Sequence, residues 1–140
     1  MERTLCIIKP DAVEKKYAGN IIARIEEEGF TILGLKRARL NRPTVEAFYA
    51  VHRERPFFGE LCDYMVGGPV VLIALEAENA VDKWRKVIGA TDSREAEKGT
   101  IRNLYGVDKS QNAVHGSDSP ENGRIEIGVF FSESELIEQR

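Results

Sequence analysis

The chain has 140 residues, of which 42% are apolar and 31% charged, and its formal net charge is −3 at pH 7. This composition is typical of one globular domain spanning residues 1–140, and it argues against general disorder. The acidic balance excludes the overall basic surface of a duplex-DNA binder, but it is compatible with a local basic cleft for a phosphorylated small molecule.

The two cysteines and the N-terminus indicate the compartment. Cys6 and Cys62 each lie in an apolar stretch and form no CxxC pair, so we expect two reduced, buried thiols. No apolar run approaches the roughly 18 residues of a membrane helix. The first residues lack the basic and apolar regions of a signal peptide. We therefore expect a cytoplasmic protein that does not enter a membrane.

The apolar pattern predicts elements in the order β-α-β-α-α-β-α-β-α. The expected strands cover residues 4–8, 30–40, 69–75 and 124–131. The expected helices cover residues 19–28, 44–52, 56–65, 79–87 and a short segment capped by Ser132. This order suits an α/β protein of the α+β type, with a ferredoxin-like four-stranded antiparallel sheet covered by helices. A parallel doubly wound sheet is the alternative, although four strands would make a thin one.

A long segment from Gly89 to Gly123 holds few large apolar residues and many Gly, Ser, Asn and Asp. Such stretches inside a compact domain are usually functional or disordered. Disorder is one interpretation; against it, Ile101, Tyr105 and Val114 could anchor the segment to a core. We therefore expect a long active-site loop here.

His115 stands in this segment within the run NAVHGSDS at residues 112–119. Taken alone it could be a surface histidine, and residues this close in sequence rarely orient as a Ser/His/Asp triad. An imidazole with an ordinary pKa near 6.5 can instead attack directly as a nucleophile. Gly116 would allow a tight bend beside it, and Ser117 with a downstream carboxylate could hold the ring.

Attack on phosphorus would require cations, because phosphoryl transfer depends on positioning and electrostatics. Lys9, Arg85 and Arg102 are the candidates, and Lys9 stands out because it follows a buried strand. The chain has no P-loop signature, and two His and two Cys at these separations make a weak case for zinc.

The run at 112–119 resembles the active-site signature of nucleoside diphosphate kinases. The resemblance covers essentially the whole chain, with several motifs in the right order. The further matching motifs are IKPD at 8–11, Tyr49, RPFF at 55–58, GPV at 68–70, GAT at 89–91, GTIR at 99–102 and EI at 126–127.

This resemblance implies that His115 accepts the γ-phosphoryl group of ATP or another nucleoside triphosphate. It then passes the group to a nucleoside diphosphate in a ping-pong cycle that maintains NTP and dNTP pools. By the same resemblance Glu126 fixes the tautomer of the ring and Ser117 lies beside the attacked phosphate. Tyr49 and Lys9 line the pocket, and Lys9 stabilises charge on the moving group.

The resemblance also implies a nucleotide-binding set. Phosphates would be bound by Arg85, Thr91 and Arg102, the sugar hydroxyl by Asn112 with Lys9, and the base by stacking on Phe57. Stacking on a ring tolerates every base. Phe58 beside it suggests that one ring of the pair packs inward. Mg²⁺ would accompany the nucleotide and be held mainly by its phosphates, without a protein metal cage.

Some positions depart from the family pattern. Asn103-Leu104-Tyr105 stand where a small residue, an Asp and an aromatic are usual, so that Asp is missing. Asp92-Ser93 replaces a common Asn-Pro, and residues 119–123 replace a more helical link to Glu126. These departures keep open a non-catalytic nucleotide-binding or regulatory protein. A ferredoxin-like nucleic-acid binder is not expected as the main role, because the strands carry mostly aliphatic residues. The short tail resembles that of bacterial members, which implies a homo-oligomer, either a tetramer or a hexamer.

Overall fold

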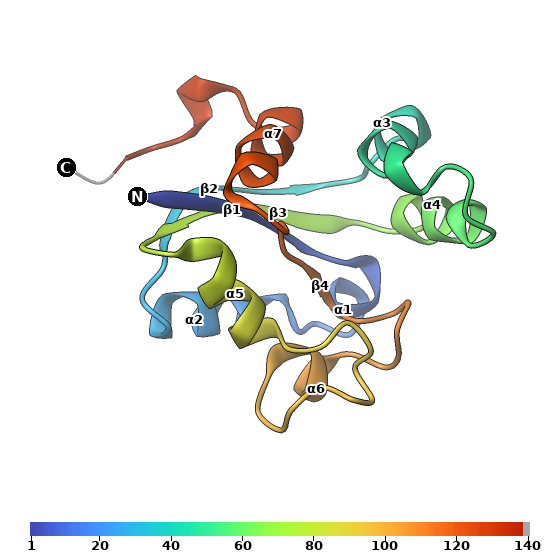
Figure 1. The fold of residues 1–140 in the computed structure, drawn as a ribbon, viewed down its shortest axis with the longest axis horizontal. Helices are drawn as coiled ribbons and strands as arrows, with labels where there is room; N and C mark the ends of the chain where they lie inside the picture. The colour runs from blue at the N-terminus through green and yellow to red at the C-terminus, as the bar shows by residue number, and fades with distance from the viewer. Residues whose placement is uncertain (139–140) are drawn as a thin grey trace.

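Four strands form one antiparallel sheet in the order β2-β3-β1-β4 (Figure 1). The computed structural model describes residues 1–138 of the chain. The strands are β1 (Glu2–Ile8), β2 (Thr31–Ala38), β3 (Val70–Ala77) and β4 (Val114–His115). The prediction of a ferredoxin-like α+β fold is confirmed, and the parallel alternative is wrong because every pairing is antiparallel.

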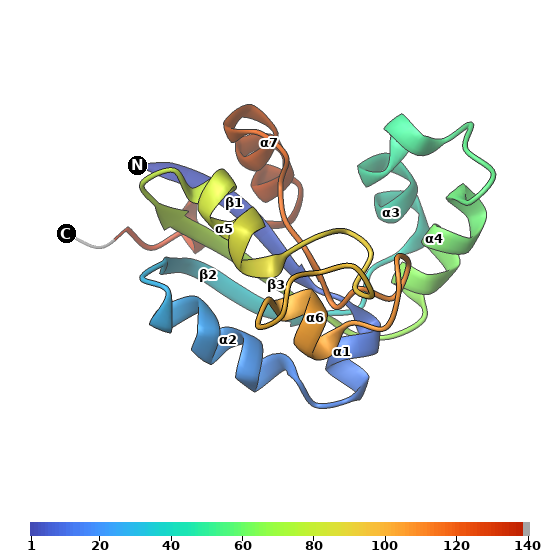
Figure 2. The ribbon, with the colours of Figure 1, turned by 60° about the horizontal axis from the view of Figure 1, so that its bottom comes forward.

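Helices cover both faces of this sheet. They are α1 (Pro10–Glu14), α2 (Ala18–Glu27), α3 (Arg42–Phe48), α4 (Phe58–Val66), α5 (Ala80–Ile88), α6 (Ile101–Tyr105) and α7 (Pro120–Phe130), with short 3-10 helices η1 (Ala50–His52) and η2 (Glu133–Glu135). Turning the molecule brings α2, α5 and α6 in front of the sheet (Figure 2), while α7 lies behind it. Helices α3 and α4 project at one end, and we call residues 42–66 the α3–α4 arm. No helix among residues 1–138 is long and apolar enough to span a bilayer.

The central strand β1 divides the core into two clusters. Its side chains alternate, so Cys6 and Ile8 face α2 and α5, whereas Leu5 and Ile7 face α3, α4 and α7. All four are fully buried, which explains the continuous apolar run in the sequence. Cys62 lies in the second cluster, and both cysteines are free and buried, as predicted.

The expected strand at 124–131 is wrong, because residues 124–130 form the second half of helix α7 and Phe131 is its C-cap. Ser119 caps the helix by accepting a hydrogen bond from the Asn122 backbone N–H at 3.1 Å, and Pro120 begins it. Ile127 and Phe131, four residues apart, are buried in the second cluster. The two-residue strand β4 takes the edge position instead.

The segment from Gly89 to Gly123 is ordered, so the disorder interpretation is wrong. Ile101 and Val114 are fully buried, and the rings of Tyr17 and Tyr105 lie 4.9 Å apart between centroids. Asn103 also supports this segment. Its side chain accepts a hydrogen bond from the Gly99 N–H at 3.3 Å and donates one to the Ala96 carbonyl at 3.4 Å.

Candidate active site

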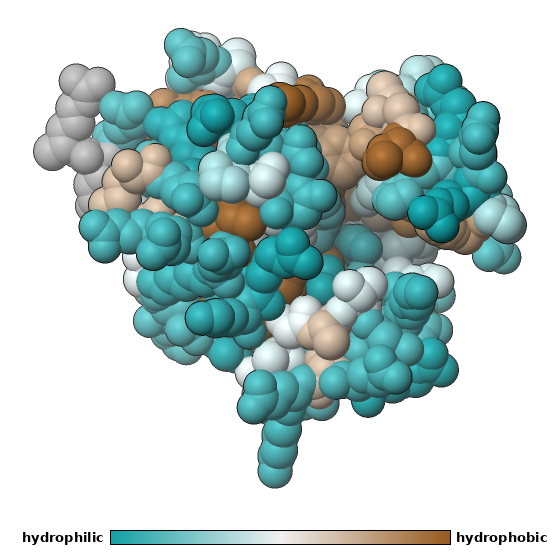
Figure 3. Space-filling model, viewed as in Figure 1, coloured by the Kyte–Doolittle hydropathy of each residue, from teal (hydrophilic) through white to brown (hydrophobic). Residues whose placement is uncertain are grey.

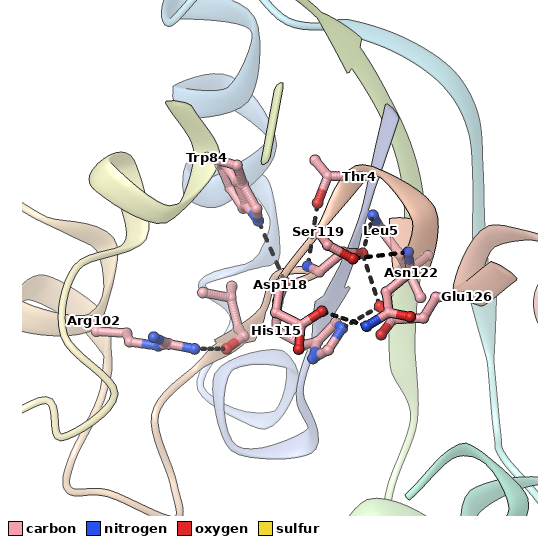
Figure 4. Close-up of polar contacts among 11 residues, drawn as sticks. Thr4, Leu5, Trp84, Arg102, His115, Asp118, Ser119, Asn122 and Glu126 are labelled. Carbon is pink, nitrogen blue, oxygen red and sulfur yellow. Dashed lines mark hydrogen bonds and ion pairs between the residues drawn. The ribbon is translucent and has the colours of Figure 1, made fainter. Parts of the chain in front are cut away.

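Pairing of β4 with β1 brings His115 to the middle of the molecule. His115 stands opposite Ile7, and the next residue, Gly116, passes close to α5. A Cβ atom on Gly116 would lie 2.8 Å from Cδ1 of Trp84. The indole Nε1 of Trp84 also donates to the His115 carbonyl at 3.3 Å (Figure 4). Only glycine fits this passage between sheet and helix.

The imidazole of His115 is held by a carboxylate from α7. Its Nε2 lies 2.8 Å from Oε1 of Glu126, and the Ser117 hydroxyl donates to the same oxygen at 2.7 Å. Because a carboxylate accepts, Nε2 carries the proton and Nδ1 keeps its lone pair. Within residues 1–138 no hydrogen bond engages Nδ1. The side chains of His115 and Glu126 are 17% and 20% exposed, so solvent reaches this pair.

The turn between β4 and α7 is fixed to strand β1. The Ser117 N–H donates to the Thr4 hydroxyl at 3.2 Å, and the Leu5 N–H donates to the Ser117 hydroxyl at 3.0 Å. Figure 4 shows Thr4 and Leu5 on one side of this turn and Glu126 on the other. The backbone of β1 therefore orients Ser117, and Ser117 in turn orients the Glu126 carboxylate.

The α3–α4 arm contributes aromatic groups. The ring of Phe48 lies 5.4 Å from that of His115, edge to face. The Tyr49 hydroxyl is buried without a hydrogen-bond partner in the described chain. Burial and, to a lesser extent, nearby Glu126 raise the pKa of Tyr49 above its usual range.

Phe57 is 41% exposed whereas Phe58 packs on the second cluster, so the expected division of this pair is confirmed. The surface is hollowed between the arm and the segment that carries α6 (Figure 3).

Buried Lys9 and partly buried Arg102 lie near β4, and the charge of Arg85 acts on Arg102. Lys9 Nζ donates to the Asn112 side-chain oxygen at 2.8 Å. Burial, and then the charge of Arg102, lowers the pKa of Lys9 to about 8. Burial, and then the charge of Arg85, lowers the pKa of Arg102 to about 10. None of the three forms an ion pair with an acidic group in the part of the chain described, which suits them to an anion.

Backbone groups also fix the nucleotide-binding candidates. Arg102 donates to the carbonyls of Gly89 and Val114, each at 3.0 Å, and its buried Nε has no partner among residues 1–138. Asn112 donates to the Thr91 carbonyl at 2.9 Å. The fold thus brings Lys9, Asn112 and Arg102 to β4, which we call the histidine strand because it carries His115. The side chains of Arg85, Thr91 and Phe57 are exposed and make no hydrogen bond with His115.

Sequence reasoning did not assign roles to Phe48, Trp84 and Thr4, which hold the histidine segment. Trp84 is the only tryptophan of the chain and immediately precedes Arg85, which could have served as a signal. Among residues 1–138 no cluster of three or more His, Cys, Asp or Glu side chains could hold a metal ion. The candidate site combines the cations Lys9 and Arg102 with one imidazole that the Glu126 carboxylate orients.

The family model described as nucleoside diphosphate kinase matches residues 2–136. The chain belongs to the nucleoside diphosphate kinase family. A nucleoside diphosphate kinase of Pelobacter propionicus is 54% identical over 137 residues, which cover 98% of this chain and 100% of that relative. One of Persephonella marina is 49% identical over 138 residues, which cover 99% of each chain.

Solved nucleoside diphosphate kinases share the fold. The Aquifex aeolicus enzyme superposes with a TM-score of 0.95 at 50% identity, covering 97% of this chain and 99% of its own. The Halobacterium salinarum enzyme, solved in complex with CDP, gives a TM-score of 0.96 at 36% identity, covering 99% and 93%. The chain is therefore a phosphotransferase that moves the γ-phosphoryl group of a nucleoside triphosphate to a nucleoside diphosphate. Nucleoside diphosphate kinases work through a phosphohistidine and use Mg²⁺.

Proposed function

We propose that His115 is the phosphoryl carrier of this nucleoside diphosphate kinase. The observation that carries the proposal is the bond from Nε2 to Glu126, which leaves the lone pair of Nδ1 free. Nδ1 attacks the γ-phosphorus of ATP, the N–P bond forms, and the bond from phosphorus to the β-phosphate oxygen breaks. A second nucleoside diphosphate then attacks the same phosphorus, and the N–P bond breaks.

The carboxylate of Glu126 supports this chemistry by favouring the attacking tautomer and by stabilising positive charge on the ring. Ser117 keeps Glu126 in place through the bond at 2.7 Å and also lies beside the attacked phosphate. We assign Tyr49 to the same pocket, because its buried hydroxyl has no partner in the described chain and carries a proton. It can donate that proton in a hydrogen bond to the substrate.

The nucleotide would bind along the basic groups. Phosphate binding falls to Lys9, Arg85, Thr91 and Arg102, where Lys9 also neutralises charge on the moving group. Asn112 and Lys9 contact the sugar hydroxyl, and the exposed ring of Phe57 stacks on the base. The CDP in the Halobacterium salinarum structure supports a nucleotide as ligand here. A stacked base would be accepted with little regard to its identity.

We propose that Mg²⁺ enters with the nucleotide as part of the substrate. The residues present fit this arrangement, because the candidate phosphate-binding groups Lys9, Arg85 and Arg102 are cations, which bind phosphate oxygens rather than a metal ion. Phosphate oxygens and water are the ligands Mg²⁺ takes in such sites. When bound, the ion would neutralise part of the triphosphate charge. Lys9, Arg85 and Arg102 would neutralise the remainder.

Labelling with γ-³²P ATP tests this function. The folded protein should acquire an acid-labile, alkali-stable phosphoryl group, and GDP or CDP should discharge it. His115→Ala should abolish labelling while nucleotide binding persists. Absence of label on folded wild-type protein would overturn the proposal.

We also propose a homo-oligomer, a tetramer or a hexamer, built from further copies of this chain. Its support is the edge strand β2 with Leu35 45% exposed, together with Ile125 and Val129, 59% and 47% exposed on α7. Light scattering at micromolar concentration should give four or six times the monomer mass of 15.7 kDa. A monomer mass would contradict this.

We further propose that residues 1–140 form one domain and that the enzyme acts in the cytoplasm. The two core clusters share a single sheet, which supports one domain; residues 139 and 140 lie outside the described part of the chain. The two free thiols fit a reducing compartment.

A further inference from the structure

Asp11 is a buried carboxylate that the mechanism above does not use. It lies in the first turn of α1 and is 6% exposed. Its Oδ2 accepts a hydrogen bond from the Ala113 backbone N–H at 3.2 Å. Its Oδ1 accepts one from the hydroxyl of Tyr64, which comes from α4. One side chain therefore connects the start of α1, the α3–α4 arm and the histidine strand.

Ala113 has an unusual backbone conformation. Its φ is +72°, in the left-handed region that residues with a Cβ rarely adopt. Both of its backbone polar groups are held by the junction of β1 and α1. The Lys9 N–H donates to the Ala113 carbonyl at 2.8 Å, and Asp11 accepts from the N–H. Ala113 is also fully buried, so water cannot replace either bond.

The position of Ala113 connects this conformation to the proposed chemistry. His115 follows Ala113 by two residues. Asn112, whose side chain accepts a hydrogen bond from Lys9 Nζ, immediately precedes Ala113. A change in φ at Ala113 would rotate the chain that enters β4. That rotation would displace the imidazole relative to Lys9, and misplacement of about 1 Å can slow a reaction about 100-fold.

We infer that Asp11 is a positioning residue, whose carboxylate holds Ala113 in the left-handed conformation and thereby aligns His115 with the γ-phosphate of the nucleotide. This inference rests on the proposed role of His115 as phosphoryl carrier. Tyr64 orients the carboxylate from the opposite side, and so fixes the arm that carries Phe57 to the histidine strand. Loss of the Tyr64 hydroxyl leaves the bond to Ala113 in place and has the smaller effect.

A comparison of two phosphoryl donors distinguishes a misaligned His115 from a general loss of structure. ATP at saturating concentration requires His115 to meet a bound phosphate, whereas phosphoramidate, a small free donor, does not. In Asp11→Ala the rate of His115 phosphorylation by ATP should fall about 10- to 100-fold, and the rate with phosphoramidate should stay near that of the wild type. Glu14→Ala, which removes an exposed carboxylate from the same helix, should change neither rate.

A second substitution tests the route through Ala113. Glycine adopts positive φ without help, so Ala113→Gly should restore much of the ATP-driven rate in the Asp11→Ala background. If Asp11→Ala does not fold, Asp11→Asn takes its place. The neutral amide oxygen is a weaker acceptor than a carboxylate. The rate with ATP divided by the rate with phosphoramidate should therefore fall several-fold, and it should recover when Ala113→Gly is added.

The possible results are distinguishable. An unchanged rate with ATP, an equal loss with both donors, or no recovery on adding Ala113→Gly overturns the inference about Asp11. Failure of the wild-type protein to take phosphate from ATP at all overturns the proposed function instead.

Discussion

Nε2 of His115 lies 2.8 Å from a carboxylate oxygen of Glu126, and this contact determines which ring nitrogen keeps its lone pair. The same oxygen accepts a hydrogen bond from Ser117, whose hydroxyl is held by the Leu5 N–H. The imidazole is thus oriented by a chain of groups that begins in the backbone of the central strand. Its free nitrogen lies on the side away from that chain.

Replacing Glu126 by Gln tests this orientation. Glutamine keeps the shape but removes the charge that favours the Nε2–H tautomer, so phosphorylation of His115 by ATP should slow about 10- to 100-fold. Glu121→Gln, an exposed position in the first turn of the same helix, is the matched control and should leave the rate unchanged. Stopped-flow or quenched-flow measurement of phosphoenzyme formation checks both. Equal rates for Glu126→Gln and wild type would contradict the role of Glu126.

Glycine at position 116 is required by packing. In Gly116→Ala the new Cβ would meet Trp84 at 2.8 Å, and this overpacking should lower the free energy of unfolding by about 1–3 kcal/mol. Gly128→Ala is the control, because Gly128 is exposed and no atom outside the local backbone of helix α7 lies within 4 Å of its Cβ position. That variant should gain about 0.5–1 kcal/mol from helix propensity. Urea denaturation measures both, and a tolerated Gly116→Ala would contradict the close contact.

Burial of Lys9 predicts a pH dependence of stability. Its pKa falls from 10.5 in the unfolded chain to about 8 when folded, so between these values the unfolded chain binds more protons. The contribution of Lys9 to the free energy of unfolding therefore rises as pH increases from about 8 to 10.5, by roughly 3 kcal/mol in all.

Comparison with Lys9→Met isolates this contribution. Cys6, whose pKa is raised mainly by burial, acts in the opposite direction above pH 9 in both proteins and cancels in the difference. The stability of Lys9→Met relative to wild type should be greatest near pH 7 and should shrink as pH rises through 8 to 10.5. A difference that is independent of pH would show that Lys9 keeps its ordinary pKa.

Phe57 and Phe58 provide a matched pair. Phe57 is exposed, so Phe57→Ala should leave stability nearly unchanged and weaken nucleotide binding by about 1–3 kcal/mol through loss of stacking. Phe58→Ala should chiefly reduce the free energy of unfolding, because its ring packs on the second cluster. Calorimetric titration with ADP and thermal melts separate the two effects. The reverse pattern would contradict the assignment of Phe57 to the base.

Much of the fold could be predicted from local patterns. The runs at β1 and β3 are apolar on both faces because both clusters use them, and the order of elements then indicated the sheet topology. The prediction of the fourth strand was wrong. It arose because Ile125, Ile127 and Val129 alternate with other residues, as apolar residues do in a strand. The capping of α7 by Ser119 and the burial of Ile127 with Phe131 outweigh that alternation.

Residue type alone led to His115, Lys9 and Arg102 as candidates, which the structure brings to one region and whose roles stay predictions. The contacts that support them could not be predicted. Trp84, Phe48 and Asp11 act through tertiary neighbours far away in sequence, and Ala113 carries no sign of a left-handed conformation. Such roles depend on burial and on backbone geometry, which one sequence does not contain.

The most direct measurement is phosphorus NMR of the freshly phosphorylated enzyme, combined with mass spectrometric mapping of the modified residue. The orientation of the imidazole predicts a single phosphoryl group on Nδ1 of His115. A phosphoryl group on Nε2, on another residue, or on none would contradict the account.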